Sequence, residues 1–249
     1  RDRLLHHAIY RKLYPYFDKQ FIHDSYSCRL DKGTHKALMQ FKRFSNKVSC
    51  NHTKTTWILK CDVRKFFASI DQGILLNILR RHIVDDDIIH LLRVIIQSFQ
   101  STGIGKGLPL GNLTSQLLVN IYMNEFDQYV KRVLKAKYYI RYADDFVVLS
   151  QDKKYLKEML VHIQTFLIEK LKLQLHPDKV FIKTLASGVD FLGWVHFPKH
   201  KIIRTVTKKR MFKKLRDSPK EETVQSYLGL LKHGNTYRLI DHMSYIIPS

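Results

Sequence analysis

Cysteine is scarce in this chain, and its three residues are not spaced for cross-linking or for a familiar metal module. Cys28, Cys50 and Cys61 form no Cys-x-x-Cys pair and leave an odd thiol. This pattern argues against a disulfide scaffold and favours a reducing cytosol. As zinc ligands, Cys50, His52 and Cys61 would have a spacing that matches no standard module. We therefore expect a cytoplasmic protein with free thiols.

Long apolar runs and targeting patterns are also missing. No stretch approaches the roughly 18–20 apolar residues that a membrane span requires, and no secretory signal pattern is present. The chain contains no internal repeat and no low-complexity tract. It begins with Arg1 rather than Met, so we expect the sequence to start inside a longer protein.

Acidic residues are few. Lys and Arg number 43 against 22 Asp and Glu, which gives a formal net charge of +21. Such an excess points to a polyanionic partner, most simply the phosphates of nucleic acid. The alternative is a basic surface without a partner. With 249 residues, 45% of them hydrophobic, the chain can bury the core of one large domain or two small ones.

Hydrophobic periodicity and turn residues predict strands mixed with helices, without regular alternation, which indicates an α+β fold. The predicted helices are 4–17, ending near Pro15, 31–44, 75–79, 88–99, 112–134 with Asn112 or Thr114 as its cap, 155–173 and 222–232. The predicted strands are 57–63, a hairpin over 138–150, and short strands around 180–183 and 189–197. Glycines at 103, 105, 107 and 111 predict a flexible loop, and a very basic segment precedes the last helix.

Three aspartates follow or interrupt apolar strands. Asp62 comes at the end of a buried strand, where a carboxylate needs compensation. Asp144 and Asp145 lie at the predicted hairpin turn; the alternative for them is an ordinary solvated turn. Magnesium prefers hard oxygen ligands, and two such ions can activate a hydroxyl and stabilise a leaving phosphate oxygen. If the two segments are adjacent strands, the three aspartates can share those ions.

Five segments in order, over about residues 25–200, resemble the motifs of reverse transcriptases. Residues 60–71 are similar to the first catalytic motif, and Tyr142-Ala143-Asp144-Asp145 is similar to the YxDD signature. Residues 107–116 resemble the loop-and-helix motif between them, and residues 173–179 and 191–194 resemble the two motifs that follow. The resemblance implies an RNA-directed DNA polymerase, with Asp62, Asp144 and Asp145 as catalytic residues.

The resemblance also assigns further residues. It implies metal ligation by Asp62, Val63, Asp144 and Asp145, with two Mg²⁺ ions that Mn²⁺ can replace. It implies nucleotide binding by Arg29, Lys32, Val63, Phe67, Leu110, Gly111 and Lys179, with Phe67 excluding a 2′-hydroxyl. It implies a primer grip at Phe191, Leu192, Gly193 and Trp194. The alternatives are core packing for Phe67, solvated surface roles for the basic residues, and an ordinary strand turn for 191–194.

A right-hand polymerase is the implied architecture, with antiparallel palm strands backed by helices. Fingers and palm would occupy residues 1–200, the fingers mainly 1–56 and 74–106. Residues 201–249 would form an incomplete, basic, helical, thumb-like region along the template–primer minor groove. The implied partners are template RNA, cDNA primer and deoxynucleotides, without a membrane.

Details within the motifs resemble the enzymes of diversity-generating retroelements, a bacterial and phage group related to group II intron enzymes. Leu110 stands where many reverse transcriptases have glutamine, and Gln116 where they have proline. Loss of an amide near the incoming nucleotide would weaken discrimination, so error-prone copying is expected. This group also implies a small basic accessory protein. Bacterial defence and intron-encoded enzymes, a non-synthesising maturase-like RNA-binding protein and an RNA-dependent RNA polymerase remain as alternatives.

Overall fold

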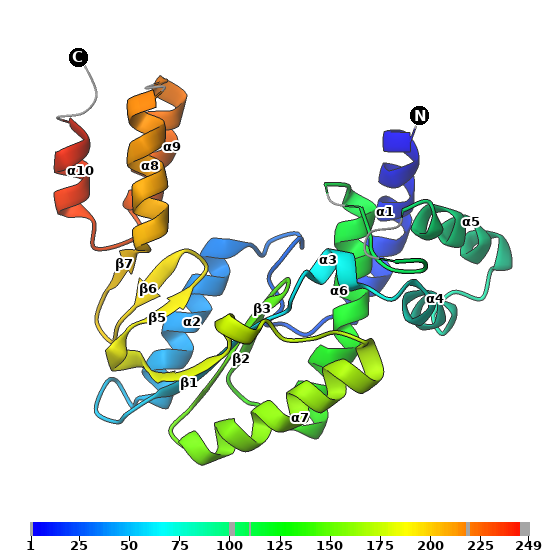
Figure 1. The fold of residues 1–249 in the computed structure, drawn as a ribbon, viewed down its shortest axis with the longest axis horizontal. Coiled ribbons are helices and arrows are strands. Elements are labelled where there is room, and N and C mark those ends of the chain that lie inside the picture. The colour runs from blue at the N-terminus through cyan, green and yellow to red at the C-terminus, as the bar shows by residue number, and fades with distance from the viewer. Residues whose placement is uncertain (1, 100–102, 110, 218–219, 245–249) are drawn as a thin grey trace. The chain divides into compact units, whose positions relative to one another are not determined.

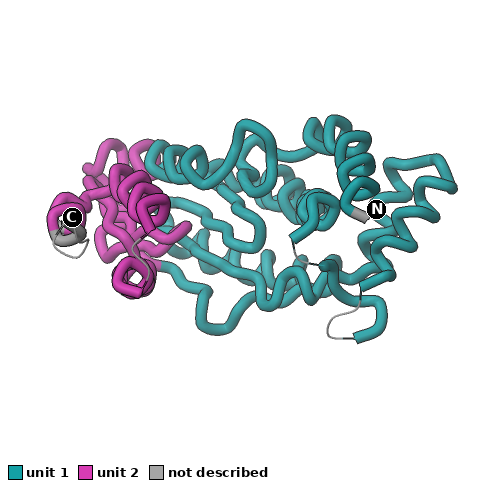
Figure 2. The backbone as a smooth tube through the Cα atoms, turned by 90° about the horizontal axis from the view of Figure 1, so that it is seen from above, with its two compact units in different colours: residues 1–44, 57–182 teal, residues 45–56, 183–249 magenta. Residues whose placement is uncertain are grey.

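The structure is a computed structural model that describes residues 2–99, 103–109, 111–217 and 220–244. The chain forms two compact units, which Figure 2 shows in different colours. Unit 1 comprises residues 1–44 and 57–182, and unit 2 comprises residues 45–56 and 183–249. Among the described residues, none of the helices combines the length and apolar character that crossing a bilayer requires.

Unit 1 holds most of the helices and the larger sheet, and two of its elements, α2 and β4, continue a few residues into unit 2. Its elements are α1 (Asp2–Asp18), α2 (Thr34–Val48), β1 (Trp57–Asp62), α3 (Phe66–Ser69), α4 (Gln72–Arg80), α5 (Asp86–Gln97), α6 (Leu113–Gln128), the π-helix η1 (Tyr129–Val133), β2 (Tyr139–Tyr142), β3 (Asp145–Ser150), α7 (Lys153–Leu171), the 3₁₀-helix η2 (Pro177–Lys179) and β4 (Phe181–Thr184).

The larger sheet has the strand order β2-β3-β1-β4. β1 pairs antiparallel with β3, and β2 pairs antiparallel with β3 across a tight hairpin. The four middle residues of both β1 and β3 are buried without alternation, as expected of strands covered on both faces. Helix α7 packs against β1 and β3, and α6 packs against α1, α4 and α7 (Figure 1). The end residues of β1 and β3 are therefore more exposed than their middle residues.

Unit 2 is built around a second antiparallel sheet. Its elements are η3 (Leu185–Ser187), β5 (Val189–Phe191), β6 (Trp194–His196), β7 (Lys201–Ile203), α8 (Thr205–Asp217), α9 (Glu221–Leu231) and α10 (Tyr237–Ser244). The strand order is β5-β6-β7. Leu192 and Gly193 form the turn between β5 and β6 with positive φ angles of 51° and 84°. Gly234 lies against the Trp194 ring so closely that a Cβ atom would collide with it.

Most predicted elements are confirmed, with shifted ends. The helix predicted to end near Pro15 is wrong at that end, because α1 continues through Pro15 to Asp18. The Asn112 cap is confirmed: its side chain accepts a hydrogen bond of 2.7 Å from the Ser115 amide. The basic segment before the last predicted helix, in the region expected to be helical, forms α8.

The backbone of the loop predicted to be flexible is held by hydrogen bonds over residues 105–108. Its backbone makes three hydrogen bonds to the segment after β1: Gln72 to Gly105 (3.0 Å), Gly107 to Ile70 (2.8 Å) and Leu108 to Phe67 (2.9 Å). These bonds anchor residues 105–108 against unit 1. Leu110, predicted to contact the nucleotide, lies outside the described residues.

Candidate active site

The ends of β1 and β3 bring the predicted catalytic aspartates together. In the strand register Asp62 lies opposite Asp145, and the Val63 amide donates a 3.2 Å hydrogen bond to the Asp144 carbonyl. Asp144 occupies the hairpin turn, between Tyr142 and Asp145, which pair with each other. Two stretches about eighty residues apart in the chain therefore place three carboxylates at one end of the sheet.

A two-residue turn of Ala143 and Asp144 leads into Asp145, the first residue of β3. Ala143 has φ +54°, in the left-handed region. A residue with a Cβ atom loses about 1–2 kcal/mol in that region, so the surrounding structure must hold the turn. One such contact is the hydrogen bond of 3.0 Å from Arg141 Nη1 to the Ala143 carbonyl.

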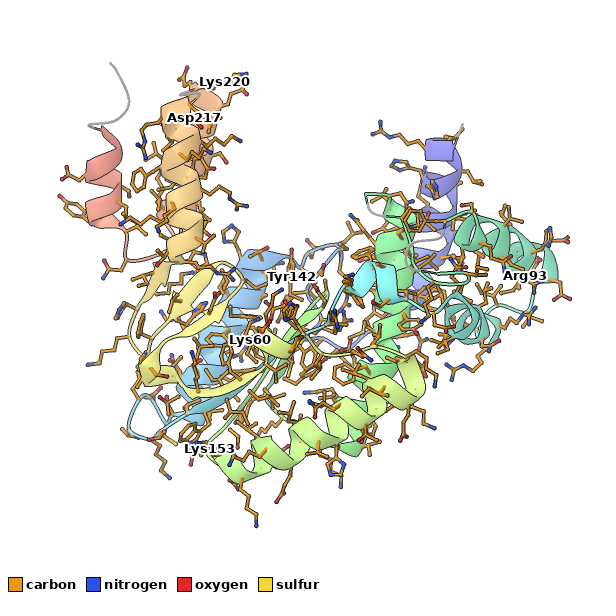
Figure 3. All side chains as sticks on the ribbon, in the orientation of Figure 1. Lys60, Arg93, Tyr142, Lys153, Asp217 and Lys220 are labelled. Carbon is orange, nitrogen blue, oxygen red and sulfur yellow. The ribbon has the colours of Figure 1, made fainter. Side chains whose placement is uncertain are left out.

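Two lysines face the carboxylates. Lys60 Nζ lies 3.2 Å from Asp145 Oδ1, and the Lys60 side chain is only 7% exposed. Lys179 Nζ lies 3.1 Å and 3.2 Å from the two carboxylate oxygens of Asp62, and its side chain is 52% exposed. Figure 3 labels Lys60 on β1 and Tyr142 at the end of β2, both within the sheet. Each of the two strand-end aspartates thus has one ammonium partner.

The backbone after α7 positions Lys179 beside Asp62. Arg64 N donates to the Gln174 carbonyl at 2.8 Å, and His176 N donates to the Asp62 carbonyl at 2.7 Å. Val63 forms an isolated antiparallel bridge with Leu175. Because these bonds fix residues 174–176 along the end of β1, η2 and its last residue, Lys179, follow directly beside Asp62.

Burial and mutual repulsion raise the pKa values of the acidic pair. Desolvation is the largest cause of the rise in the pKa of Asp145 to about 7; the Lys60 ammonium opposes it, and the Asp62 and Asp144 charges add to it. The pKa of Asp144 is raised by burial and by the Asp62 charge, against the Lys179 and Lys60 ammonium groups. The site therefore disfavours three simultaneous negative charges unless further positive charge is supplied.

The donor set fits a hard divalent cation. All three side chains are carboxylates, the ligands that Mg²⁺ prefers. Asp145 Oδ1 is buried and, among the described residues, receives no hydrogen bond of regular geometry, although Lys60 is close. No three His, Cys, Asp or Glu side chains in the described part of the chain are already gathered tightly enough to chelate an ion. Lys60 and Lys179 supply positive charge beside Asp145 and Asp62.

Phe67 and its neighbour Phe66 differ in their surroundings. Phe66 is buried in the core at 4% exposure, whereas Phe67 is only partly buried and meets the Phe66 ring edge-on with centroids 5.6 Å apart. The Phe67 carbonyl accepts the Leu108 amide. Phe67 is thus the ring of the two that is accessible from outside.

Arg29 and Lys32, predicted to bind nucleotide, are already engaged within the protein. Arg29 donates to Asp18 Oδ1 (2.7 Å) and to the Ile22, Ser25 and Asp18 carbonyls, and its side chain is 6% exposed. Lys32 Nζ donates to the His23 carbonyl at 2.9 Å and lies over the Tyr26 ring. Both assignments stay predictions; Arg29 would have few donors left for a phosphate.

Gly111 and the predicted primer-grip residues belong to other segments of the chain. Gly111 directly precedes the α6 cap and has φ +91°. Phe191 and Trp194 are buried partners across the β5–β6 hairpin of unit 2, with Leu192 and Gly193 at its turn. Their assignment as a primer grip stays a prediction.

Several polar residues of the site were not singled out from the sequence. Lys60 lies inside the buried part of β1, and Arg141 inside β2 is fully buried with Asp127 of α6 as its ion-pair partner at 2.7 Å. The available signal was a charged residue within each apolar strand, since such a residue needs a buried partner. The sequence does not say which residue that partner is.

The sequence matches a family model described as "Reverse transcriptase (RNA-dependent DNA polymerase)" over residues 1–196. The chain is 28% identical to Protein YkfC of Escherichia coli over 241 residues, which cover 82% of this chain and 61% of YkfC. It is 23% identical to the group II intron-encoded protein LtrA of Lactococcus lactis over 263 residues, which cover 78% of this chain and 42% of LtrA. The chain therefore spans less than two thirds of either relative.

Solved structures of telomerase share the fold. Telomerase from Candida albicans, in complex with a fragment of telomeric RNA, has a TM-score of 0.58 at 12% sequence identity. The match covers 92% of this chain and 44% of the telomerase chain. The fold is accordingly the α+β right-hand polymerase fold that the sequence predicts.

Asp145→Asn should reduce the pH dependence of the free energy of unfolding, measured in the presence of a chelator. The native pKa of Asp145 is about 7, raised from 3.8, so between these values the native state holds a proton that the unfolded chain has lost. Wild-type stability should therefore fall by about 2–3 kcal/mol as pH rises from about 5 to about 8. The variant should lack this contribution. Urea unfolding in the presence of a chelator measures the decline at each pH.

Asp152→Asn is the matched control for this measurement, because Asp152 is exposed at the start of α7 and asparagine also caps helices. It should show the wild-type decline. An equal decline in the Asp145→Asn protein would contradict the raised pKa.

Proposed function

Because this chain belongs to the reverse transcriptase family, we propose that it is an RNA-directed DNA polymerase that extends a primer on an RNA template with two Mg²⁺ ions. The observation that supports this most directly is the register that sets Asp62 opposite Asp145, with Asp144 in the adjoining turn. Carboxylates in this arrangement suit phosphoryl transfer, where catalysis consists largely of positioning and charge stabilisation.

The carboxylates of Asp62 and Asp144, with Asp145 and the Val63 backbone beside them, are the proposed ligands. When bound, the ions lower the pKa of the primer 3′-hydroxyl and stabilise the charge of the leaving pyrophosphate. Lys60 keeps Asp145 in place from the buried side. Lys179 offers a half-exposed ammonium group to the incoming phosphates.

Substrate selection is proposed to depend on Phe67 and on the loop before α6. A partly exposed ring five residues after Asp62 can exclude a 2′-hydroxyl and favour deoxynucleotides. Gly111, with its positive φ, allows the backbone to approach a nucleotide where a side chain would be strained. Lys32 and Arg29 remain proposed phosphate contacts, through the donors that their internal bonds leave over.

Template RNA and primer are the proposed polyanionic partners. The net charge of +21 supports this, as does the exposed basic surface of α8. The telomerase that shares the fold is described in complex with RNA. Under this proposal residues 1–200 supply fingers and palm, and 201–249 supply a thumb-like region. The Phe191–Trp194 hairpin would hold the primer end.

The retroelement type is a finer proposal. Leu110 and Gln116, in the form Leu-Gly-x-x-x-Ser-Gln, support an error-prone enzyme of a diversity-generating retroelement, working with a small basic accessory protein. An intron-encoded enzyme is the second candidate, favoured by the similarity to LtrA. The two differ in the fidelity expected of the enzyme.

Asp144→Asn should abolish primer extension while leaving nucleic-acid binding intact. Loss of one ion-binding carboxylate should reduce the extension rate by about 10²-fold or more, since charge stabilisation at the reacting phosphate is lost. Extension of a DNA primer on an RNA template with Mg²⁺ measures the rate, and a mobility shift measures binding. Asp152→Asn, the same change on the surface, should extend at the wild-type rate. Equal extension by Asp144→Asn would refute the metal assignment and favour a non-synthesising RNA-binding protein.

Phe67→Ala should increase the use of ribonucleotides. Removal of the ring opens the space for a 2′-hydroxyl, and one such group changes discrimination by about 10-fold to 200-fold. The ratio of kcat/KM for deoxynucleotide and ribonucleotide should fall by a factor in that range. Phe67→Tyr keeps the ring and should keep the preference. An unchanged ratio in Phe67→Ala would show that the ring is not the gate, and a wild-type preference for ribonucleotides would favour an RNA-dependent RNA polymerase.

Leu110→Gln should reduce misincorporation opposite template adenine. The amide restores a hydrogen-bonding contact near the nucleotide, and a contact of this kind contributes about 10-fold or more to discrimination. Sequencing of cDNA copied from an adenine-containing template measures the error rate. Leu4→Gln, the same change at an exposed position of α1, should leave it unchanged. If wild type were already as accurate as Leu110→Gln, the intron-encoded candidate would be preferred.

A further inference from the structure

Arg141 is a fully buried cation directly beneath the catalytic turn. It lies in the middle of β2, and neither its side chain nor that of its partner, Asp127 of α6, is exposed. Two charges removed from water at this depth do not stabilise a fold better than apolar side chains of similar volume would. Stability alone therefore does not explain why this position of an otherwise apolar strand carries arginine.

The hydrogen bonds of Arg141 use every N–H of its guanidinium group. Nε donates to both Asp127 oxygens (2.8 and 3.0 Å), and Nη2 donates to Asp127 Oδ2 (2.7 Å) and Ser25 Oγ (3.0 Å). Nη1 donates to Asn120 Oδ1 (3.2 Å) and to the Ala143 carbonyl (3.0 Å). Because all five N–H donors are bound, the planar guanidinium group is held in one orientation. The ammonium group of a lysine cannot make the same set of bonds.

These bonds connect three parts of unit 1 at one point. Asp127 and Asn120 belong to α6, and Ser25 belongs to the segment that leads toward Arg29 and Lys32. Backbone hydrogen bonds also connect Arg141 to the segment that contains Ser25. Tyr26 N donates to the Arg141 carbonyl (2.9 Å), and Arg141 N donates to the Asp24 carbonyl (3.0 Å). The bond to Ala143 is the one that reaches the catalytic turn.

Ala143 is the residue that needs such support. Its φ of +54° is unfavourable for alanine, and the next residue is Asp144. A turn of this kind relaxes toward other conformations unless its carbonyl is held. The guanidinium holds that carbonyl from below while α6 holds the guanidinium.

We propose that Arg141, anchored by Asp127, is a positioning residue that fixes the Ala143–Asp144 turn in its ion-binding conformation and ties it to residues 24–26. The inference rests on the proposed function for its catalytic consequence. Arg141 touches neither the substrate nor the reacting atoms; it acts through the Ala143 carbonyl. Tyr139 donates to the same carboxylate, Asp127 Oδ1, at 2.7 Å, without a contact to the turn.

Three variants separate positioning from simple stability. Arg141→Lys keeps the positive charge but removes the planar guanidinium group. Arg141→Met combined with Asp127→Leu replaces the pair by apolar side chains, which commonly preserves a fold. Tyr139→Phe is the matched control, because it removes a buried hydrogen bond from the same Asp127 and leaves the Arg141 contacts in place.

Three measurements follow for each variant. Hydrogen exchange of the amides of residues 142–145 is compared with that of α6 in ion-free protein. Binding of Mn²⁺ to the protein without nucleic acid is measured by electron paramagnetic resonance. Primer extension gives kcat and the KM for deoxynucleotide.

In both Arg141 variants the amides of residues 142–145 should exchange hydrogen about 10-fold faster than in wild type, while the exchange rates of α6 change little. The affinity of both variants for Mn²⁺ should fall by about 10-fold. Their kcat should fall by about 10²-fold, as expected of a misplaced reacting group, with KM nearly unchanged. Tyr139→Phe should lower the melting temperature and leave turn exchange, Mn²⁺ affinity and kcat near the wild-type values.

Wild-type turn exchange and Mn²⁺ affinity in a folded Arg141 variant would overturn the positioning role. So would a Tyr139→Phe protein that loses Mn²⁺ affinity as severely as the Arg141 variants, since the effect would then follow stability. A wild-type protein that neither binds Mn²⁺ nor extends a primer would defeat the proposed function instead. Turn exchange would still decide whether Arg141 holds the turn in that case.

Discussion

The repulsion among three carboxylates at the end of two neighbouring strands is the constraint on which the polar interior of unit 1 depends. Asp62 and Asp145 face each other in the register and Asp144 adjoins them, so burial and like charge together raise the pKa values of the acidic pair. Lys60 and Lys179 offset this repulsion in the ion-free protein. Because an arrangement of this kind costs folding free energy, its presence in a buried position favours a role in binding cations over a role in stability.

The charged residues around the site divide into two groups by what they contact. Lys60 and Lys179 contact carboxylates and supply positive charge. Arg141 and Asp127 contact each other, and through Ala143 they contact the backbone of the turn. The first group acts on the charge of the site and the second on its geometry. Ala143 links the two groups, since its carbonyl accepts from Arg141 and the next residue is Asp144.

The sequence predicted the elements that depend on local pattern. β1 and the β2–β3 hairpin are short apolar runs, α6 is a long run rich in apolar residues, and Asn112 stands where a helix cap is expected, so these were found with small errors at their ends. Pro15 was expected to end the first helix, but α1 continues through it, and the bounds of α8 were not assigned because its basic residues conceal a buried face of Met211, Phe212 and Leu215. The family followed from the order of motifs. The partners of Lys60 and Arg141 could not be predicted, because pairs such as Asn120–Arg141 and Ser25–Arg141 arise only when distant segments pack together.

The difference in exposure between the two lysines bears on which of them can serve a substrate. Lys60 is held within β1 with its side chain buried, so its ammonium has no route to a triphosphate and stays with Asp145. Lys179 ends a short 3₁₀-helix, is half exposed, and reaches Asp62 from the outer side of the strand. A surface ion pair of this kind contributes little free energy, about 0–1 kcal/mol, so its ammonium can exchange one anionic partner for another at small cost. The contact with Asp62 is therefore compatible with the predicted place of Lys179 beside the pyrophosphate, whereas four hydrogen bonds within the protein already engage the guanidinium of Arg29.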